Sequence, residues 1–486
     1  MFYRASDPVG GYLEFNEGFY LLNAVRDLGR GLFAPVISPL DANNPFVYPW
    51  LLALAVRSFG VSTLVARGLS IVASVASVLL TFALGRQLYN DRIAAFAAVL
   101  TALTPGFVLV GRNVQIDGVA LAIELGALYA FVRARKDHSR PWAIAAGALL
   151  GIGLLTKLPI ALVVPTVVAW ETWRSGNPAW MRDRLVWWWA GIAAAVPVSW
   201  YALRAIASRG GSLAAQTAII AAAGSRNGLA QLPRMVFGEE VWIFTPLLAA
   251  AVLVGIVVCI RKRTPADLFV ISYLGVHAAT YLVFNYHSYY FLPLVPIGAI
   301  AAARGVWGLG ARTAVSLAVA CALAAALLVP TSLYMLADKK WTIQDHRQIV
   351  SAIRDAGLNP ADTTVLVDPF EWGSFGPGIE YTLRQGGVHD VVDTSVATTP
   401  TTTSVVLLAP ARTSAPNLRV LSGLTLDVRA PILFGWVLRP PPPFDHGAFR
   451  LPWPQIERVA PFWRFGVETR PWIDQRSVFE VSKPGP

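Results

Sequence analysis

The sequence predicts a polytopic α-helical membrane protein of about ten spans, followed by a C-terminal α/β domain outside the membrane. Hydrophobic residues make up 55% of the 486 residues and charged residues only 14%, whereas a soluble domain has about 25% charged residues. The charge is also uneven, because residues 1–337 hold 25 Lys and Arg against 14 Asp and Glu, while residues 338–486 hold 15 of each. This composition excludes a disordered chain and an ordinary soluble enzyme.

Ten apolar segments approach the length of about 20 residues that a helix needs to cross a bilayer. They are residues 62–85, 93–111, 114–132, 142–156, 158–173, 186–206, 241–260, 266–284, 288–303 and 313–335. The sequence Lys157-Leu158-Pro159 favours a tight turn between the fourth and fifth segments, because proline interrupts a helix. The segment 47–59 is apolar but too short to span, so we expect an interfacial helix within an outer loop at residues 1–61.

The basic residues predict the orientation of the spans. One set of loops, 42 residues in all, holds 14 Lys and Arg, including the cluster Arg261, Lys262 and Arg263. The positive-inside rule places these loops in the cytoplasm, so both termini and the domain at 338–486 are expected outside a plasma membrane. Cations that punctuate apolar segments in this way do not form the single basic face that nucleic-acid binding requires.

The region after residue 337 changes character. Residues 343–356 have the pattern of a short amphipathic helix, and residues 363–368 and 404–409 have the pattern of strands. We therefore expect residues 338–486 to form a small α/β domain, after a helical membrane region at 62–337.

Four groups of polar residues are expected on the outer face of the membrane. Ionisable side chains close to the membrane are energetically costly, so each group is a candidate for a function. The groups are Glu14 and Glu17; Arg112 and Asp117; Lys157; and His287, Tyr289 and Tyr290. Each group has an ordinary explanation as well: a solvated loop acid, a helix cap, a lysine reaching for the interface, or an aromatic belt. Glu124 lies seven residues into a span and is expected to pair inside the bundle.

The order of these motifs resembles the GT-C superfamily of membrane glycosyltransferases, in particular the dolichyl-phosphate-mannose protein mannosyltransferases and the lipid A aminoarabinose transferases. The resemblance covers about residues 14–335. The matching elements are NEGFY at 16–20, YPWLLAL at 48–54, Arg67 at the head of a span, Arg112 with Asp117, LTKLP at 155–159 and HSYYFLP at 287–293. Asn16 departs from the acidic pair that usually opens the family's first outer loop. The family also has a span before that loop, so we expect the natural chain to start further upstream.

The resemblance implies a sugar donor carried on polyprenyl phosphate and an acceptor hydroxyl on a protein, lipid or polysaccharide. It implies Glu17 as the catalytic base, with Glu14 as the second candidate, and Asp117 as a residue that binds the acceptor or orients a cation. The phosphate would be held by the remaining site residues, which are Lys157, Arg112, Arg67, His287, Tyr289 and Tyr290. It implies no cofactor and does not demand a metal, although a divalent ion stays open.

Two other classes of function fit the same sequence. A lipid or polymer transporter would also have many spans with intramembrane charges, although such proteins often show related halves that are absent from this sequence. A non-catalytic scaffold that displays the C-terminal domain would leave Lys157 and Asp117 unexplained. Release of sugar from a polyprenyl-phosphate donor separates the transferase from both.

Overall fold

The computed structural model describes residues 14–37, 45–207, 246–283, 288–308, 319–325, 329, 346–367, 369–394, 404–410, 418–429, 432–433, 436–437 and 471–481. The chain forms two compact units. The helical unit comprises Met1–Phe2, Arg26–Val61 and Val65–Met335. The sheet unit comprises Tyr3–Val25, Ser62–Leu64 and Leu336–Pro486. The first described helix, α1 (Glu14–Arg30), contributes residues to both units.

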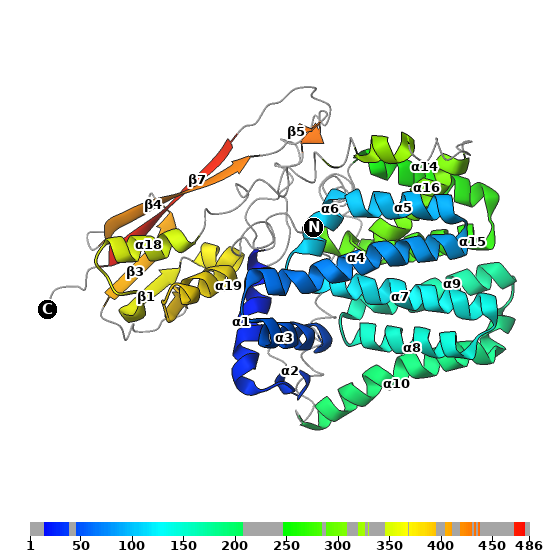
Figure 1. Ribbon diagram of the computed structural model, residues 1–486, viewed down its shortest axis with the longest axis horizontal. Coiled ribbons are helices and arrows are strands. Elements are labelled where there is room, and N and C mark those ends of the chain that lie inside the picture. Colours follow the sequence, from blue (N-terminus) through cyan, green and yellow to red (C-terminus); the bar gives the residue numbers. More distant parts are fainter. Residues whose placement is uncertain are drawn as a thin grey trace. The chain divides into compact units, whose positions relative to one another are not determined.

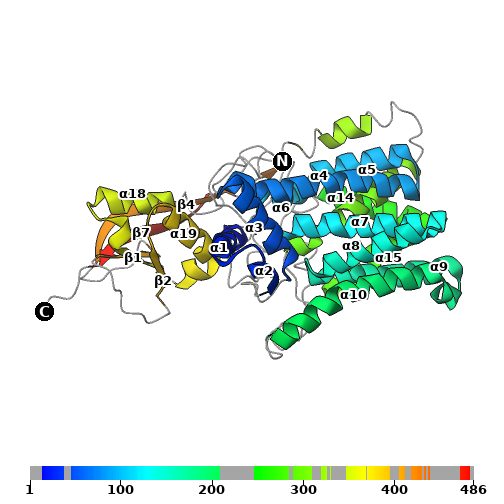
Figure 2. The same cartoon turned by 60° about the horizontal axis from the view of Figure 1, so that its bottom comes forward.

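The helical unit is a bundle of α-helices (Figure 1), and 3-10 turns lie in three of its described connections. Its described elements are α2 (Ala34–Ile37), α3 (Val47–Phe59), α4 (Thr63–Leu88), α5 (Asp91–Leu103), α6 (Pro105–Arg112), α7 (Ile116–Asp137), α8 (Arg140–Leu154), η1 (Leu158–Leu162), α9 (Val163–Ser175), η2 (Pro178–Arg182), α10 (Arg184–Ala207), α14 (Pro246–Lys262), α15 (Pro265–Val283), η5 (Ser288–Phe291) and α16 (Leu294–Gly308). Helix α8 packs between α7 and α10, which Figures 1 and 2 show from two sides. Helix α16 packs against both α5 and α14.

Two described helices are long and apolar enough to cross a membrane, namely Thr63–Leu88 and Arg184–Ile206. The pair Asp91–Leu103 and Pro105–Arg112 passes the same test together but is bent by 63°, so it counts as a broken span or a re-entrant loop. The count of ten spans therefore stays a prediction, and part of the tenth expected segment lies outside the described residues. The structure explains why several expected spans are shorter: breaks divide the apolar runs.

The break between α5 and α6 follows from one proline. Helix α5 ends at Leu103, and Pro105 opens α6 in its first turn, where the missing N–H of proline costs nothing. All eight residues of α6 are buried. The result is a short buried helix that carries Arg112 as its last residue.

The break expected at Lys157 is also present. Helix α8 ends at Leu154, and Lys157 precedes η1 with an extended backbone at φ −151°. The N–H of Val47, the first residue of α3, donates to the carbonyl oxygen of Leu155 at 3.0 Å. Val47, Leu155 and Trp200 of α10 share one hydrophobic cluster. The helix expected over 47–59 therefore packs on the turn that presents Lys157.

The sheet unit contains a five-stranded sheet in the order β2-β1-β3-β7-β4. Its described elements are α18 (Arg347–Asp355), η7 (Pro360–Asp362), β1 (Thr363–Val367), α19 (Pro369–Gln385), β2 (Asp390–Asp393), β3 (Ser404–Pro410), β4 (Leu418–Arg429), β5 (Ile432–Leu433), β6 (Trp436–Val437) and β7 (Pro471–Val481). Strand β1 pairs in parallel with β2 and β3, and β7 is antiparallel to β3 and β4.

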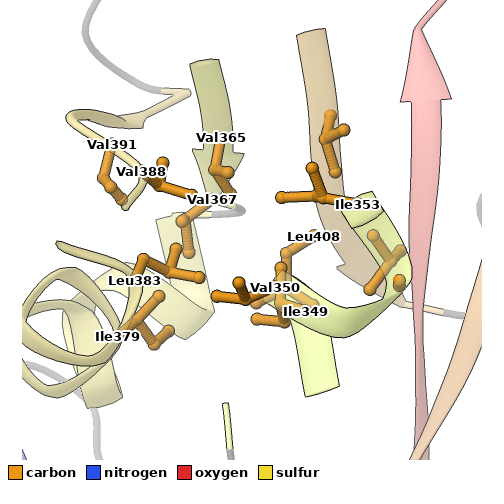
Figure 3. Packing of buried hydrophobic residues seen from close by; sticks show 13 residues of the cluster. Ile349, Val350, Ile353, Val365, Val367, Ile379, Leu383, Val388, Val391 and Leu408 are labelled. Atoms are coloured by element: carbon orange, nitrogen blue, oxygen red, sulfur yellow. The ribbon is translucent and has the colours of Figure 1, made fainter. Parts of the chain in front are cut away.

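Parallel strands must have their faces covered, because each crossover returns along one face of the sheet. Helices α18 and α19 provide that cover, and Figure 3 shows their apolar side chains against β1 and β3. Ile353 of α18, Leu383 of α19 and Val365 of β1 are each fully buried in this hydrophobic core. The residues of α1 up to Val25 belong to the same unit.

Candidate functional site

The second predicted group, Arg112 and Asp117, lies on either side of the connection between α6 and α7. The backbone of this connection is held by α4, because Ser74 Oγ donates to the carbonyl oxygen of Gly111 at 2.8 Å and Ser70 Oγ donates to that of Gln115 at 3.3 Å. Three- and four-residue spacings on a helix share a face. Arg67 therefore lies on the same face of α4 as these two serines, and the structure brings it to the side of the bundle that carries Arg112.

Asp117 and Lys157 form a buried ion pair across two separate turns. Lys157 Nζ donates to Asp117 Oδ1 at 2.5 Å, and the two side chains are only 9% and 3% exposed. Gln115 Nε2 donates to the other carboxylate oxygen at 2.9 Å. Lys157 thus does not reach out to the interface, and Asp117 holds a cation in addition to lying in the first turn of α7.

Tyr290 forms a third side of this site. The ammonium of Lys157 lies 4.2 Å from the centre of the Tyr290 ring, within the range of a cation–π contact. The hydroxyl of Tyr281 in α15 donates to the carbonyl oxygen of Tyr290 and so fixes the backbone of η5. Of the predicted group at 287–290, His287 and the side chain of Tyr289 lie outside the described residues, so their roles stay predictions.

A pocket opens beside the ion pair and extends into the bundle. It is lined by Asp117, Ala120, Leu121, Glu124, Lys157, Pro159, Ile160, Leu162, His277, Tyr281, Tyr290 and Pro293. The walls are apolar or aromatic and the polar groups are few. Such a combination is typical of a small-molecule site, in which a few placed charges orient a ligand.

Glu124 lies seven residues, or about two helical turns, beyond Asp117 on α7. Its carboxylate accepts a hydrogen bond from the hydroxyl of Tyr273 at 2.7 Å, and His277 Nε2 lies 3.6 Å away. The expectation that Glu124 pairs inside the bundle is confirmed. Three further residues, Tyr273, His277 and Tyr281, were not among those expected from the sequence, although their spacing of four residues along α15 places them on one polar face of an apolar helix.

The two acidic candidates, Glu14 and Glu17, belong to the part of α1 that is assigned to the sheet unit. Glu17 is fully buried, and burial of a carboxylate costs free energy unless the group is paired or hydrogen-bonded. Glu14 is the first residue of α1, and its side chain lies outside the described residues. The choice between them as the base is therefore still a prediction.

A metal would need a cluster of oxygen, nitrogen or sulfur ligands. Within the described ranges, no group of three or more His, Cys, Asp and Glu side chains could hold an ion. Lys157 and Arg112 are both buried, and a fixed charge acts on an anionic group more strongly in a buried site than it does in water.

Comparison with known proteins confirms the resemblance seen in the sequence: the chain has the fold of the GT-C membrane glycosyltransferases. Crystal structures of ArnT from Cupriavidus metallidurans match 99% of this chain and 96% of theirs. The TM-score is 0.64 at 13% identity for the apo state and 0.62 at 14% identity for the state bound to undecaprenyl phosphate. The oligosaccharyltransferase of Archaeoglobus fulgidus matches with a TM-score of 0.52 at 15% identity, covering 78% of this chain and 60% of that chain.

Sequence comparison points to the same class over a shorter stretch. The model of the family described as "Dolichyl-phosphate-mannose-protein mannosyltransferase" matches residues 43–202. The protein "Putative mannosyltransferase YycA" of Bacillus subtilis (strain 168) is 30% identical over 151 residues, which is 30% of this chain and 22% of that protein. The matched stretch therefore spans about a fifth of the length of this curated relative. The stretch that the family model matches, residues 43–202, includes Arg67, Arg112, Asp117 and Lys157 but not α1.

Proposed function

We propose that the protein is a membrane glycosyltransferase that moves a sugar from a polyprenyl-phosphate donor to an acceptor hydroxyl on the outer face of the plasma membrane. The observation that carries the proposal is the buried Lys157–Asp117 pair, which lines a pocket with Tyr290 in a bundle of the GT-C fold. An ionised pair is costly in an apolar bundle and marks a functional site there. The undecaprenyl phosphate in one ArnT structure supports the class of donor.

The cations provide the first part of the mechanism. Lys157, Arg112 and Arg67 would stabilise the charge that grows on the departing phosphate, which is the largest contribution that fixed groups make to such a reaction. Asp117 would orient Lys157 and keep it charged before the donor binds. His287, Tyr289 and Tyr290 would add contacts to the donor headgroup.

The bond changes follow from the leaving group. The acceptor oxygen attacks the anomeric carbon, the bond from that carbon to the phosphate oxygen breaks, and polyprenyl phosphate leaves with the electron pair. Glu17 would accept the proton of the acceptor hydroxyl as general base. Because the displacement is direct, the anomeric centre is inverted. The phosphate needs no protonation to leave, so no general acid is required.

The acceptor is proposed only as a hydroxyl compound of the cell envelope, on a protein, lipid or polysaccharide. The test is to incubate the purified protein with polyprenyl-phosphate sugars and to detect free polyprenyl phosphate by mass spectrometry. Release that depends on Lys157 supports the transferase. Movement of an intact donor between the leaflets of vesicles, without any release of sugar, would contradict it and favour a transporter.

A further inference from the structure

Helix α1 has a place in the sheet unit that its sequence does not suggest. Residues up to Val25 belong to that unit, and Gly18 faces helix α19 there. An added Cβ at Gly18 would lie 2.2 Å from the backbone nitrogen of Gly378 and 2.4 Å from the carbonyl carbon of Pro377. These are backbone atoms, so no side-chain rotation could make room. The two helices therefore meet backbone to backbone at this point.

Helix α19 is itself firmly seated on the sheet. Ile379, the residue after Gly378, and Leu383 one turn further on are both fully buried in the hydrophobic core of the sheet unit (Figure 3). The backbone at Gly378 is thus fixed by the core, and Gly18 rests directly on it. A contact between small residues of this kind lets two helices approach more closely than ordinary side chains allow.

Glu17 directly precedes Gly18 and is 0% exposed. Because successive helical residues move as one rigid turn, whatever fixes Gly18 also fixes the backbone from which the buried side chain of Glu17 extends. We propose that the sheet unit is a positioning device for Glu17, and that Gly18 is the positioning residue through which it acts. The inference rests on the proposed function, since it gives the sheet unit a role in the transfer reaction.

The size of the effect follows from the geometry. Alanine at position 18 would have to retreat by at least about 1 Å, because its Cβ would start 2.2 Å from a backbone atom and ordinary van der Waals contact begins at 3.4 Å. A misplacement of about 1 Å in a reacting group can lower a rate by about 10²-fold. Gly18→Ala should therefore lower kcat by about 10²-fold. The KM for the donor should hardly change, because the cations proposed to bind the donor belong to the helical unit.

The chain offers a matched control within the same helix. Gly29 also lies in α1, but an added Cβ there would meet nothing within 4 Å. Gly29→Ala should leave kcat and KM at the wild-type values. Hydrogen exchange followed by mass spectrometry gives an independent readout: the peptide covering residues 14–25 should exchange faster in Gly18→Ala and at the wild-type rate in Gly29→Ala.

A second variant, Ile379→Ala, weakens the packing of α19 on the sheet without changing any residue of α1. It should also speed exchange in residues 14–25 and lower kcat, which tests the proposal if Gly18→Ala does not fold. Faster exchange at 14–25 with wild-type kcat, or unchanged exchange in both variants, would overturn the proposal. Glu17→Gln is measured in parallel: an inactive Glu17→Gln beside an active, loosened Ile379→Ala overturns the positioning role alone. A fully active Glu17→Gln would instead contradict the assignment of Glu17 as the general base in the proposed function.

Discussion

Replacing Lys157 by methionine separates the stability of the site from its function. The variant keeps an unbranched apolar side chain, one atom shorter, and removes the ammonium group with its charge and its hydrogen-bond donors. For unit charges 2.5 Å apart, an effective dielectric constant of about 20 gives about 7 kcal/mol of direct attraction. Most of this attraction offsets the loss of hydration of the two ions. The stability of the variant is decided by Asp117, which would stay buried after losing Lys157 and keep the hydrogen bond from Gln115.

Leaving a buried charge without its counter-ion typically costs about 3–5 kcal/mol. Lys157→Met should therefore lower the free energy of unfolding by about that amount, and Asp117→Asn should also be costly. The double variant Lys157→Met/Asp117→Asn should be more stable than Lys157→Met alone, because it buries no unpaired charge. Chemical denaturation of the four proteins in detergent measures this coupling.

Function should not follow stability in this series. The double variant is expected to fold well and still bind the polyprenyl-phosphate donor about 10- to 100-fold more weakly, since a hydrogen bond to a charged group is worth about 1.5–3 kcal/mol. Additive effects of the two single substitutions, within about 0.5 kcal/mol, would refute the buried pair. Donor binding of wild-type strength in Lys157→Met would refute its role at the phosphate.

Three further predictions concern other parts of the chain. Glu17→Gln should abolish transfer and preserve donor binding, as measured by product formation beside a binding assay. Gly255→Ala should lower stability by about 1–3 kcal/mol, because the new Cβ would lie 1.9 Å from a carbonyl oxygen of α16, whereas Gly275→Ala in α15 meets nothing within 4 Å and should be neutral in the same thermal unfolding assay. Burial raises the pKa of Asp183, but the hydrogen bond and charge of Arg135 outweigh it and hold that pKa below 3.8. Its stabilisation is therefore present above the unfolded value and lost as the pH falls through the folded value, so Asp183→Asn should flatten the acid limb of a stability–pH curve below about pH 4.

The sequence predicts local structure well where a residue type, such as proline or a β-branched residue, directly favours one backbone conformation. Thr63–Leu88 corresponds to the expected span at 62–85, and the 3-10 turn at Leu158–Leu162 follows the break expected at Lys157. The strand at Thr363–Val367 lies where β-branched residues gather. Each of these elements is determined by neighbours a few residues away, through hydropathy, proline chemistry or strand propensity.

Contacts between distant segments could not be predicted in the same way. Asp117 and Lys157 were expected on one face, but no pattern in either segment shows that the two side chains pair. The contact of Gly18 with Gly378 is less predictable still, because a glycine in a helix gives no signal of what approaches it. Tyr273, His277 and Tyr281 are different: their spacing is visible in the sequence, and a search for polar faces in apolar helices would have found them.

The proposed function requires that this protein transfers a sugar from a polyprenyl-phosphate donor. The most direct measurement incubates the purified protein in detergent or nanodiscs with a panel of polyprenyl-phosphate sugars and a cell-envelope extract as acceptor, and counts free polyprenyl phosphate by mass spectrometry. We expect release from at least one donor by the wild type, and none by Glu17→Gln. A folded wild-type protein that turns over no donor in the panel would contradict the proposed function.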